Sequence, residues 1–284
     1  MIRIDELMFS YGGRCVYDGL STYFETGAVY GLLGKNGAGK TTLLRLIAGL
    51  TECSGGKIDI DGEIPSKRRP ELLDRLYFVP ETFSAPDIPV IDYATNIGMF
   101  YSGYDADAFD RYLKEFEVDP HQRFRRLSFG QRKKAIIAFA LSLNTSLLLL
   151  DEPGNGLDIP SKLTLRRMLS EYSGPGRTVI LSTHQVRDVE DIVDHIAVID
   201  RGRLLLNMST EDIGRRIMFM TSDCAIHGAL FSERVTGGFV NILRKSMDDD
   251  GEPTRKSRKI DMEILFNACV NGNGNFGKEV EYAL

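Results

Sequence analysis

The sequence predicts an α/β fold organised around a mainly parallel sheet. Three short apolar runs have the length and composition of buried strands, namely Ala28 to Leu33, Leu147 to Leu150 and Thr178 to Leu181. The stretch after the first run, Thr42 to Leu50, has the apolar spacing and length of a helix. Strands that alternate with helices in this way favour a parallel sheet covered by helices.

A glycine-rich loop joins the first of these strands to its helix. The segment from Gly34 to Thr41, GKNGAGKT, fits the phosphate-loop pattern G-x-x-x-x-G-K-[ST]. Its glycines let the backbone turn tightly, so that several N–H groups and the helix dipole converge on one anion. A turn that binds nothing is the alternative, and the strand–loop–helix context favours the phosphate site. The residues expected at the nucleotide are Gly34, Asn36, Gly37, Ala38, Gly39, Lys40, Thr41 and Thr42.

Two adjacent acids follow the second predicted strand. Asp151 leaves the C-terminal edge of the sheet, where its carboxylate can hold Mg²⁺ together with the hydroxyl of Thr41. Glu152 points to another part of the site because side chains alternate along a strand, and there it can orient and polarise an attacking water. Two acids at a strand end are often only a solvated turn, but a chain with a phosphate loop favours the catalytic interpretation.

Two further positions suggest contacts with phosphate. Ser128 and Gly130 precede a helical stretch from Arg132 to Leu143, and a serine and a glycine at a helix start form a second anion site. His184 ends the third predicted strand, which we expect beside the acidic one, so its imidazole could hydrogen-bond a terminal phosphate. A single histidine is more often structural, but its place at this strand end favours a functional role.

The order of these motifs resembles that of the ATP-binding subunits of ABC transporters, over about residues 1 to 212. By this resemblance the glycine loop is the Walker A motif of a P-loop NTPase core. Asp151 and Glu152 are similar to Walker B with its catalytic glutamate, and His184 is similar to the switch histidine. Tyr11 resembles the aromatic residue that stacks on adenine, although a tyrosine near the start of a chain is equally at home in a strand.

The resemblance also implies a substrate, a metal and an assembly. Members bind ATP and Mg²⁺, and two subunits pack head to tail, either as a homodimer or as a heterodimer. Each nucleotide then lies between the phosphate loop of one subunit and the signature motif, Leu127 to Gln131, of the other. This arrangement would explain the second anion site. The residues that the resemblance adds at the nucleotide are Ser128, Gly130, Gln131 and Asp158 of the D-loop, and the catalytic set it implies is Glu152, His184 and Lys40.

Two positions depart from the family pattern. Glu81, in Phe78-Val79-Pro80-Glu81, stands where a glutamine usually touches the metal, so we expect Glu81 to join Thr41 and Asp151 as a metal ligand. A glutamate keeps an oxygen at the same reach and adds a charge. Phe129 replaces the first glycine of the signature motif, and its bulk affects how closely a dimer can close.

The composition is that of a soluble enzyme with a full core. The chain has 284 residues, 43% of them hydrophobic, and a formal net charge of -5, which gives no electrostatic reason to expect a nucleic-acid partner. Four scattered cysteines, Cys15, Cys53, Cys224 and Cys269, suit free thiols in a reducing cytoplasm. No apolar stretch reaches the roughly 20 residues of a spanning helix, so we expect membrane contact only through a partner.

The chain divides into a cassette and an appendage. Residues 1–212 are expected to form the ATP-binding cassette, with an antiparallel β lobe at the start and a helical signature lobe at about 85–145. Residues 213–284 are expected to form a small C-terminal α+β appendage, with a charged loop at 248–259. Within it, 260–266 resembles the closing helix of export-type ATPase subunits, and an ordinary amphipathic helix is an equal alternative.

These observations predict an ATPase subunit that couples Mg²⁺-ATP binding, dimer closure and hydrolysis to a separate membrane permease, with export as the expected direction. The subunit would be cytoplasmic and peripheral at the inner face of the membrane. The alternative is a soluble ATP switch of the same superfamily that acts on ribosomes or DNA, but the chain has one cassette and no sustained heptads. A P-loop kinase or GTPase would leave the signature motif and His184 without a role.

Overall fold

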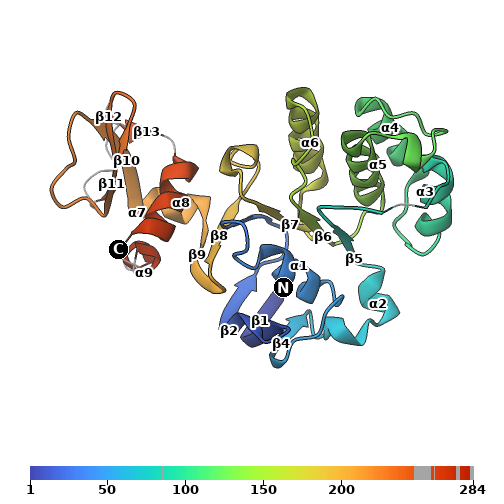
Figure 1. Cartoon of the computed structure of the whole chain (residues 1–284), viewed down its shortest axis with the longest axis horizontal. Helices are drawn as coiled ribbons and strands as arrows, with labels where there is room; N and C mark the ends of the chain where they lie inside the picture. Colours follow the sequence, from blue (N-terminus) through green and yellow to red (C-terminus); the bar gives the residue numbers. More distant parts are fainter. Residues whose placement is uncertain (85, 246–256, 259, 273–275, 282–284) are drawn as a thin grey trace.

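A six-stranded sheet forms the centre of the molecule, with strand order β5-β6-β7-β3-β8-β9 (Figure 1). The computed structural model describes residues 1–84, 86–245, 257–258, 260–272 and 276–281. All neighbouring strands of this sheet are parallel except β8 and β9, which form an antiparallel hairpin with its turn at Asp200 to Gly202. The strands are β3 (Val29–Leu33), β5 (Leu76–Val79), β6 (Leu147–Asp151), β7 (Thr178–Thr183), β8 (His195–Asp200) and β9 (Arg203–Ser209).

The two faces of this sheet pack against different parts of the chain. Along β6, Leu148 and Leu150 belong to one buried cluster and Leu147 and Leu149 to another. This follows from the two-residue period of a strand, which sends successive side chains to opposite faces. Because both faces are covered, β6 consists of apolar residues up to its last position, Asp151.

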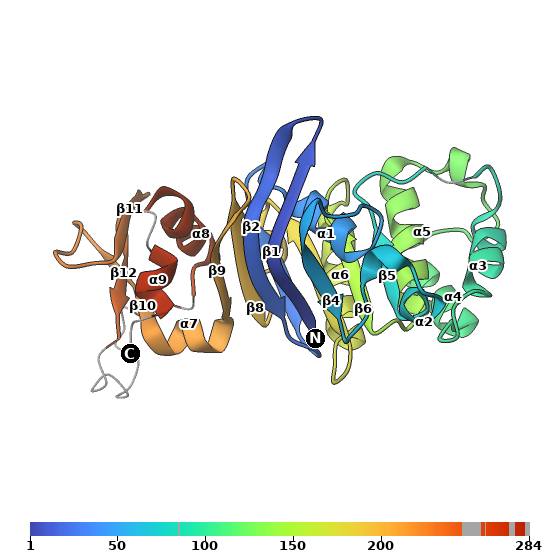
Figure 2. The same cartoon turned by 90° about the horizontal axis from the view of Figure 1, so that it is seen from below.

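The Leu147 and Leu149 face is covered by α1 (Lys40–Ile47), α2 (Pro70–Leu73) and a second sheet of order β2-β1-β4 (Figure 2). This sheet is antiparallel, as expected, and comprises β1 (Ile2–Tyr11), β2 (Arg14–Phe24) and β4 (Gly55–Ile60). Helix α1 begins at Lys40, two residues before the predicted start. Lys40 and Thr41, the last residues of the phosphate-loop motif, therefore lie in the first turn of α1, where backbone N–H groups remain available to an anion.

A helical lobe lies at the β5 edge of the central sheet (Figure 1). It contains α3 (Val90–Gly98), α4 (Ala106–Glu115) and α5 (Phe129–Ser142). Our prediction placed the start of α5 at Arg132, which is three residues too late. The reason is a capping box, in which the Ser128 side chain accepts from the Gln131 N–H and the Gln131 side chain accepts from the Ser128 N–H.

The C-terminal part packs at the opposite, β9 edge (Figures 1 and 2). An antiparallel sheet, order β11-β12-β10-β13, is combined with three helices, and the expected boundary at residue 212 falls inside the first of them, α7. The expected loop at 248–259 lies outside the described residues except for β13. The elements are α7 (Thr210–Arg216), β10 (Ile217–Ser222), β11 (Phe231–Val235), β12 (Gly238–Arg244), β13 (Ser257–Arg258), α8 (Met262–Asn271) and α9 (Phe276–Glu281).

The helix predicted at 260–266 corresponds to α8, which begins at Met262 and extends to Asn271. Helix α8 lies against the chain that follows β7. There the turn η3 (Val186–Asp188) packs on α8, with Val186 and Ile264 in the same buried cluster. An exposed ion pair joins Arg187 Nη2 and Glu263 Oε2 at 2.9 Å. The appendage therefore contacts the chain two residues after His184.

Phe139 packs against several aromatic rings inside the helical lobe, and its burial gives a prediction for the stability of the chain. Phe139 on α5 is fully buried and its ring lies 5.3 Å from Tyr93 and 5.6 Å from Tyr77 in edge-on arrangements. Phe139→Ala should lower the free energy of unfolding by about 3–5 kcal/mol, because a large cavity replaces the ring. Phe100→Ala is the matched control, since Phe100 is 73% exposed. Urea unfolding of both variants checks this, and equal midpoints would contradict it.

Candidate active site

A cavity of about 830 Å³ opens beside the phosphate loop, within the range of small-ligand sites. It is formed where the loops after β3, β5, β6 and β7 meet the strands β1 and β2. This is the C-terminal edge of the parallel strands, where open α/β sheets bind their ligands. The lining residues are Tyr11, Arg14, Cys15, Val16, Asn36, Gly37, Ala38, Gly39, Lys40, Thr41, Thr42, Glu81, Glu152, Asn155, His184, Arg201 and Gly202.

The phosphate loop is held in shape by glycines that no other residue could replace without movement. Gly39 caps α1 with φ 113°, and a Cβ there would lie 2.6 Å from the Tyr17 hydroxyl oxygen. At Gly34 a Cβ would lie 2.5 Å from the Ile199 carbonyl oxygen. The loop closes over its own lysine, because Lys40 Nζ donates to the Gly34 carbonyl at 2.8 Å. The loop therefore presents a buried cation at the cavity.

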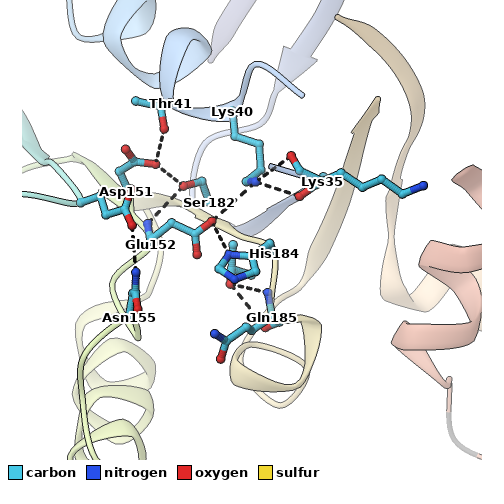
Figure 3. A network of polar contacts seen from close by, with 12 residues as sticks. Lys35, Lys40, Thr41, Asp151, Glu152, Asn155, Ser182, His184 and Gln185 are labelled. Carbon is cyan, nitrogen blue, oxygen red and sulfur yellow. Dashed lines mark hydrogen bonds and ion pairs between the residues drawn. The ribbon is translucent and has the colours of Figure 1, made fainter. Parts of the chain in front are cut away.

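The hydroxyl of Thr41 and the carboxylate of Asp151 lie together, as predicted for a metal site (Figure 3). Thr41 Oγ1 donates to Asp151 Oδ1 at 3.0 Å, and Ser182 Oγ donates to the same oxygen at 2.5 Å. Asp151 has the same parity along β6 as Leu147 and Leu149, so it faces α1. Strand β7 supplies Ser182 because it pairs with β6 and places Ser182 opposite Asp151.

Glu152 points away from Asp151 and toward two donors (Figure 3). Its Oε1 lies 2.9 Å from His184 Nδ1 and 3.5 Å from Lys40 Nζ. The backbone of Glu152 has φ 46°, which is uncommon for a residue with a side chain. Its N–H donates to the carbonyl and hydroxyl oxygens of Ser182 at 3.1 and 3.2 Å. The predicted separation of the two acids is thus present, and all three predicted catalytic residues meet here.

Glu81 lies on the cavity wall, with its carboxylate held by an amide. Asn155 Nδ2 donates to Glu81 Oε1 at 2.8 Å. Among the described residues there is no group of three or more His, Cys, Asp and Glu side chains that could hold a metal by themselves. A metal bound by Thr41, Asp151 and Glu81 would therefore need oxygen ligands from the nucleotide and water.

Another part of the cavity wall is formed by Tyr11 and by residues that sequence reasoning did not identify. Tyr11 is 46% exposed and packs edge-on against Phe9, at the end of β1. Arg14 and Val16 on β2 and Arg201 at the β8–β9 turn line the same space. These residues come from a strand and a turn that are far apart in the chain, so no local pattern in the sequence indicates them.

The signature residues lie outside this cavity. Ser128 is exposed and, with Gln131, forms the cap of α5, while Asp158 caps α6 (Ile159–Tyr172) by accepting from the Ser161 N–H at 2.9 Å. Hydrogen bonding from Ser161 holds the pKa of the Asp158 carboxyl below its usual value. Phe129 lies against Gly156, since a Cβ on that glycine would be 2.4 Å from its ring. None of Ser128, Gly130, Gln131 and Asp158 lines its own chain's cavity.

Three residues missed from the sequence complete the site, namely Ser182, Asn155 and Lys133. The first two bind the acids already named, and Lys133 on α5 is a buried lysine that donates to the Glu81 carbonyl at 2.9 Å. A signal for Lys133 exists, because it lies three and four residues before Ile136 and Ile137 on the apolar face of a helix. Ser182 and Asn155 have no comparable local pattern.

Comparisons with known proteins agree with this geometry. The family model described as ABC transporter matches residues 17–155. The bacitracin transport ATP-binding protein of Bacillus licheniformis is 31% identical over 225 residues, covering 76% of this chain and 72% of that protein. The chain belongs to the ABC transporter family. The matched region, residues 17–155, includes the phosphate loop and both acids at the end of β6.

Two more relatives and two solved structures define the extent of the likeness. A Nod factor export ATP-binding protein of Cupriavidus metallidurans is 35% identical over 199 residues, which span 68% of this chain and 66% of that protein. The chain thus spans just under two thirds of that relative. An ABC transporter ATP-binding protein of Bacillus subtilis is 26% identical over 96% of this chain and 99% of its own length.

The structural comparison places the same fold in the cassette. The structure of an ATP-binding subunit of an ABC transporter has a TM-score of 0.67 at 25% identity and covers 76% of this chain and 92% of that chain. A dimeric ATP-binding cassette with bound ADP and phosphate has a TM-score of 0.65 at 21% identity, covering 74% and 98%. The predicted P-loop NTPase core with an antiparallel lobe and a helical lobe is confirmed.

The position of Lys40 gives a prediction for ATP affinity. Lys40→Ala removes the cation at the β- and γ-phosphates, so we expect Kd for ATP to rise by roughly 10- to 150-fold, the value of a hydrogen bond to a charged group. Lys35→Ala is the matched control, because the Lys35 side chain is exposed and extends away from Lys40 (Figure 3). Titration with a fluorescent ATP analogue measures both, and equal affinities would contradict the assignment.

Proposed function

We propose that this chain is the ATP-hydrolysing subunit of an exporter, in which two ATP-binding subunits close on ATP and drive a separate integral-membrane permease. The observation that carries the proposal is the position of Glu152 between Lys40 and His184 at the mouth of the phosphate loop. A carboxylate in this place can take a proton from water that attacks the γ-phosphate.

The residues of the site divide this reaction among them. Glu152 uses Oε1 to hold His184, which leaves Oε2 to accept a hydrogen bond, and then the proton, from the attacking water. His184 is oriented through Nδ1, which donates to Glu152, so Nε2 is the nitrogen left for a γ-phosphate oxygen, and it donates there when the imidazole carries both protons. Lys40 balances the charge that develops on the β- and γ-phosphates.

We also propose that the site uses Mg²⁺, because its hydroxyl and carboxylate oxygens suit a hard cation. Thr41 Oγ1 and Asp151 Oδ1 lie 3.0 Å apart at the start of α1, and Glu81 offers a carboxylate from the neighbouring loop. When bound, Mg²⁺ would neutralise the β- and γ-phosphate charge. Ser182 and Asn155 orient these carboxylates through their hydrogen bonds.

The dimer follows from the position of the signature residues. Ser128 and Gly130 have the chemistry of an anion site but lie outside their own cavity, so they serve a nucleotide bound to another subunit. Gln131 and Asp158 lie at the starts of the helices that border this face. The partner subunit is a second copy or a related ATP-binding chain, and Tyr11 stacks on the adenine within each subunit.

We place the contact with the permease on the helical lobe. None of the described helices has the length and apolar character that a bilayer crossing requires. Met99 and Phe100 follow α3 and are 76% and 73% exposed, the most exposed neighbouring pair of large apolar side chains in the described residues. We assign this pair to the permease, which would hold the subunit at the inner face of the membrane. The export direction rests on the Nod factor export relatives.

The role of Glu152 is tested by an isosteric substitution. Glu152→Gln should cut ATP turnover by roughly 100- to 10,000-fold while ATP affinity stays near that of the wild type, because the amide cannot accept the proton. The variant should accumulate as an ATP-bound dimer. Phosphate release and light scattering measure this, with the exposed Glu52→Gln as control. Normal phosphate release from Glu152→Gln would exclude Glu152 as the base.

The shared site is tested at the signature serine. Ser128→Arg should bind ATP as a monomer but neither dimerise nor hydrolyse it, because the long cation blocks the partner's γ-phosphate. Ser170→Arg introduces the same group at an exposed position of α6 and should behave as wild type. Size-exclusion chromatography with light scattering separates the outcomes. A Ser128→Arg chain that still dimerises with ATP would favour a kinase-like monomer.

The membrane partner is tested in cell fractions from the native host. Replacing Met99 and Phe100 by serine should move the tagged chain from membranes to the soluble fraction, while ATP affinity is unchanged. Met8→Ser with Tyr23→Ser removes exposed apolar area elsewhere and is the control. A chain that sediments with ribosomes or DNA, and is released by nuclease, would support the alternative function as a soluble ATP switch.

A further inference from the structure

A buried lysine on the signature helix connects three functional segments. Lys133 is 3% exposed, and its Nζ donates to the carbonyl oxygens of Glu81 at 2.9 Å and Asp151 at 3.3 Å, with a longer contact to Pro80 at 3.5 Å. Lys133 lies one turn into α5, whose start carries Ser128 and Gly130. The carbonyls belong to the chain that follows β5 and to the last residue of β6.

The burial of this ammonium group requires an explanation. A buried charge is costly unless it is paired and hydrogen-bonded, and here backbone carbonyls use its donors. Burial lowers the pKa of Lys133 to about 8, and the carboxylates of Asp151, Glu81 and Glu152 oppose this shift. Methionine or leucine would fill the same volume without this cost, so packing alone does not account for a lysine.

The contact with Asp151 has a specific geometric consequence. The peptide between Asp151 and Glu152 is held on both sides, because its N–H donates to Ser182 and its carbonyl accepts from Lys133. The orientation of this peptide sets where the Glu152 side chain begins, and Glu152 has the uncommon φ of 46°. Lys133 thus fixes one side of the peptide that aims the Glu152 carboxylate.

We propose that Lys133 is a positioning residue that ties the aim of Glu152 and the position of Glu81 to the placement of the signature helix. When α5 moves with its Ser128 end toward the partner's nucleotide, Lys133 carries that movement to the peptide before Glu152. This rests on the proposed function, because it presumes a dimer whose closure precedes hydrolysis. Lys133 contacts neither the nucleotide loop nor the reacting atoms, so its effect belongs to turnover and closure rather than to ATP affinity.

The test uses Lys133→Met, which keeps the length of the side chain and removes its donors and charge. We expect kcat to fall by about tenfold to 100-fold, as for a small misplacement of a catalytic group, with Kd for ATP within about twofold of wild type. ATP-dependent dimer formation should also weaken when Lys133→Met is combined with Glu152→Gln. Lys133→Arg, which restores a cation with several donors, should recover part of the lost turnover. Lys114→Met, on the exposed face of α4, is the control.

The outcomes are distinguishable. An unchanged kcat in Lys133→Met overturns the inference. A parallel loss of ATP affinity and melting temperature that Lys133→Arg does not relieve also overturns it, because that result indicates a purely structural role for Lys133. If Lys133→Met does not fold, Lys133→Gln decides in its place, because it keeps an N–H donor on a shorter, neutral side chain. Its kcat must fall at constant ATP affinity, and a wild-type kcat overturns the inference. Failure of Glu152→Gln alone to form an ATP-dependent dimer would instead refute the proposed function.

Discussion

Strand β6 is the constraint on which the active site depends. Its first four residues are leucines buried alternately on the two faces of the central sheet. A shift of the strand by one residue would turn every leucine to the opposite face and would also turn Asp151 away from α1. That register directs Asp151 toward α1 and Thr41. The next residue, Glu152, leaves the strand with a positive φ and turns to Lys40 and His184. The separation of the two acids, one of which we propose to face the metal and the other the attacking water, is therefore a consequence of how the core is packed.

Four charged side chains are buried around this point, and they balance one another. Lys40, Lys133, Asp151 and Glu152 are each less than 9% exposed, two cations with two anions. A buried charge without a partner is strongly destabilising, so each is held by hydrogen bonds before any nucleotide arrives. Lys40 is shared between the Gly34 carbonyl and Glu152. In the proposed reaction, a bound phosphate that pairs with Lys40 would weaken the ion pair between Lys40 and Glu152. The Glu152 carboxylate would then be available to the attacking water.

The predictability of the site follows how local each of its determinants is. The phosphate loop and the acids at the end of β6 were predicted because strand, turn and helix are adjacent in the chain. Ser182, Asn155 and Lys133 were missed because their roles arise only when β7, the turn after β6 and α5 meet. The start of α5 was placed late because the apolar pattern becomes clear only after Arg132, whereas the capping box of Ser128 and Gln131 starts the helix at Phe129. Whether Gln131 also reaches a partner's nucleotide stays a prediction.

The two edges of the central sheet bring different parts of the chain to the site. At the β5 edge, the helical lobe carries exposed Met99 and Phe100 at the end of α3 and the signature residues at the start of α5, and Lys133 joins α5 to the backbone of Asp151. At the β9 edge, α8 packs on the turn that follows His184. In the proposed dimer, movement of the lobe would therefore reach Glu152 through α5, while the appendage holds the chain that carries His184. The hydrogen bond between Glu152 and His184 joins the segment that Lys133 holds to the segment that continues into the turn packed on α8.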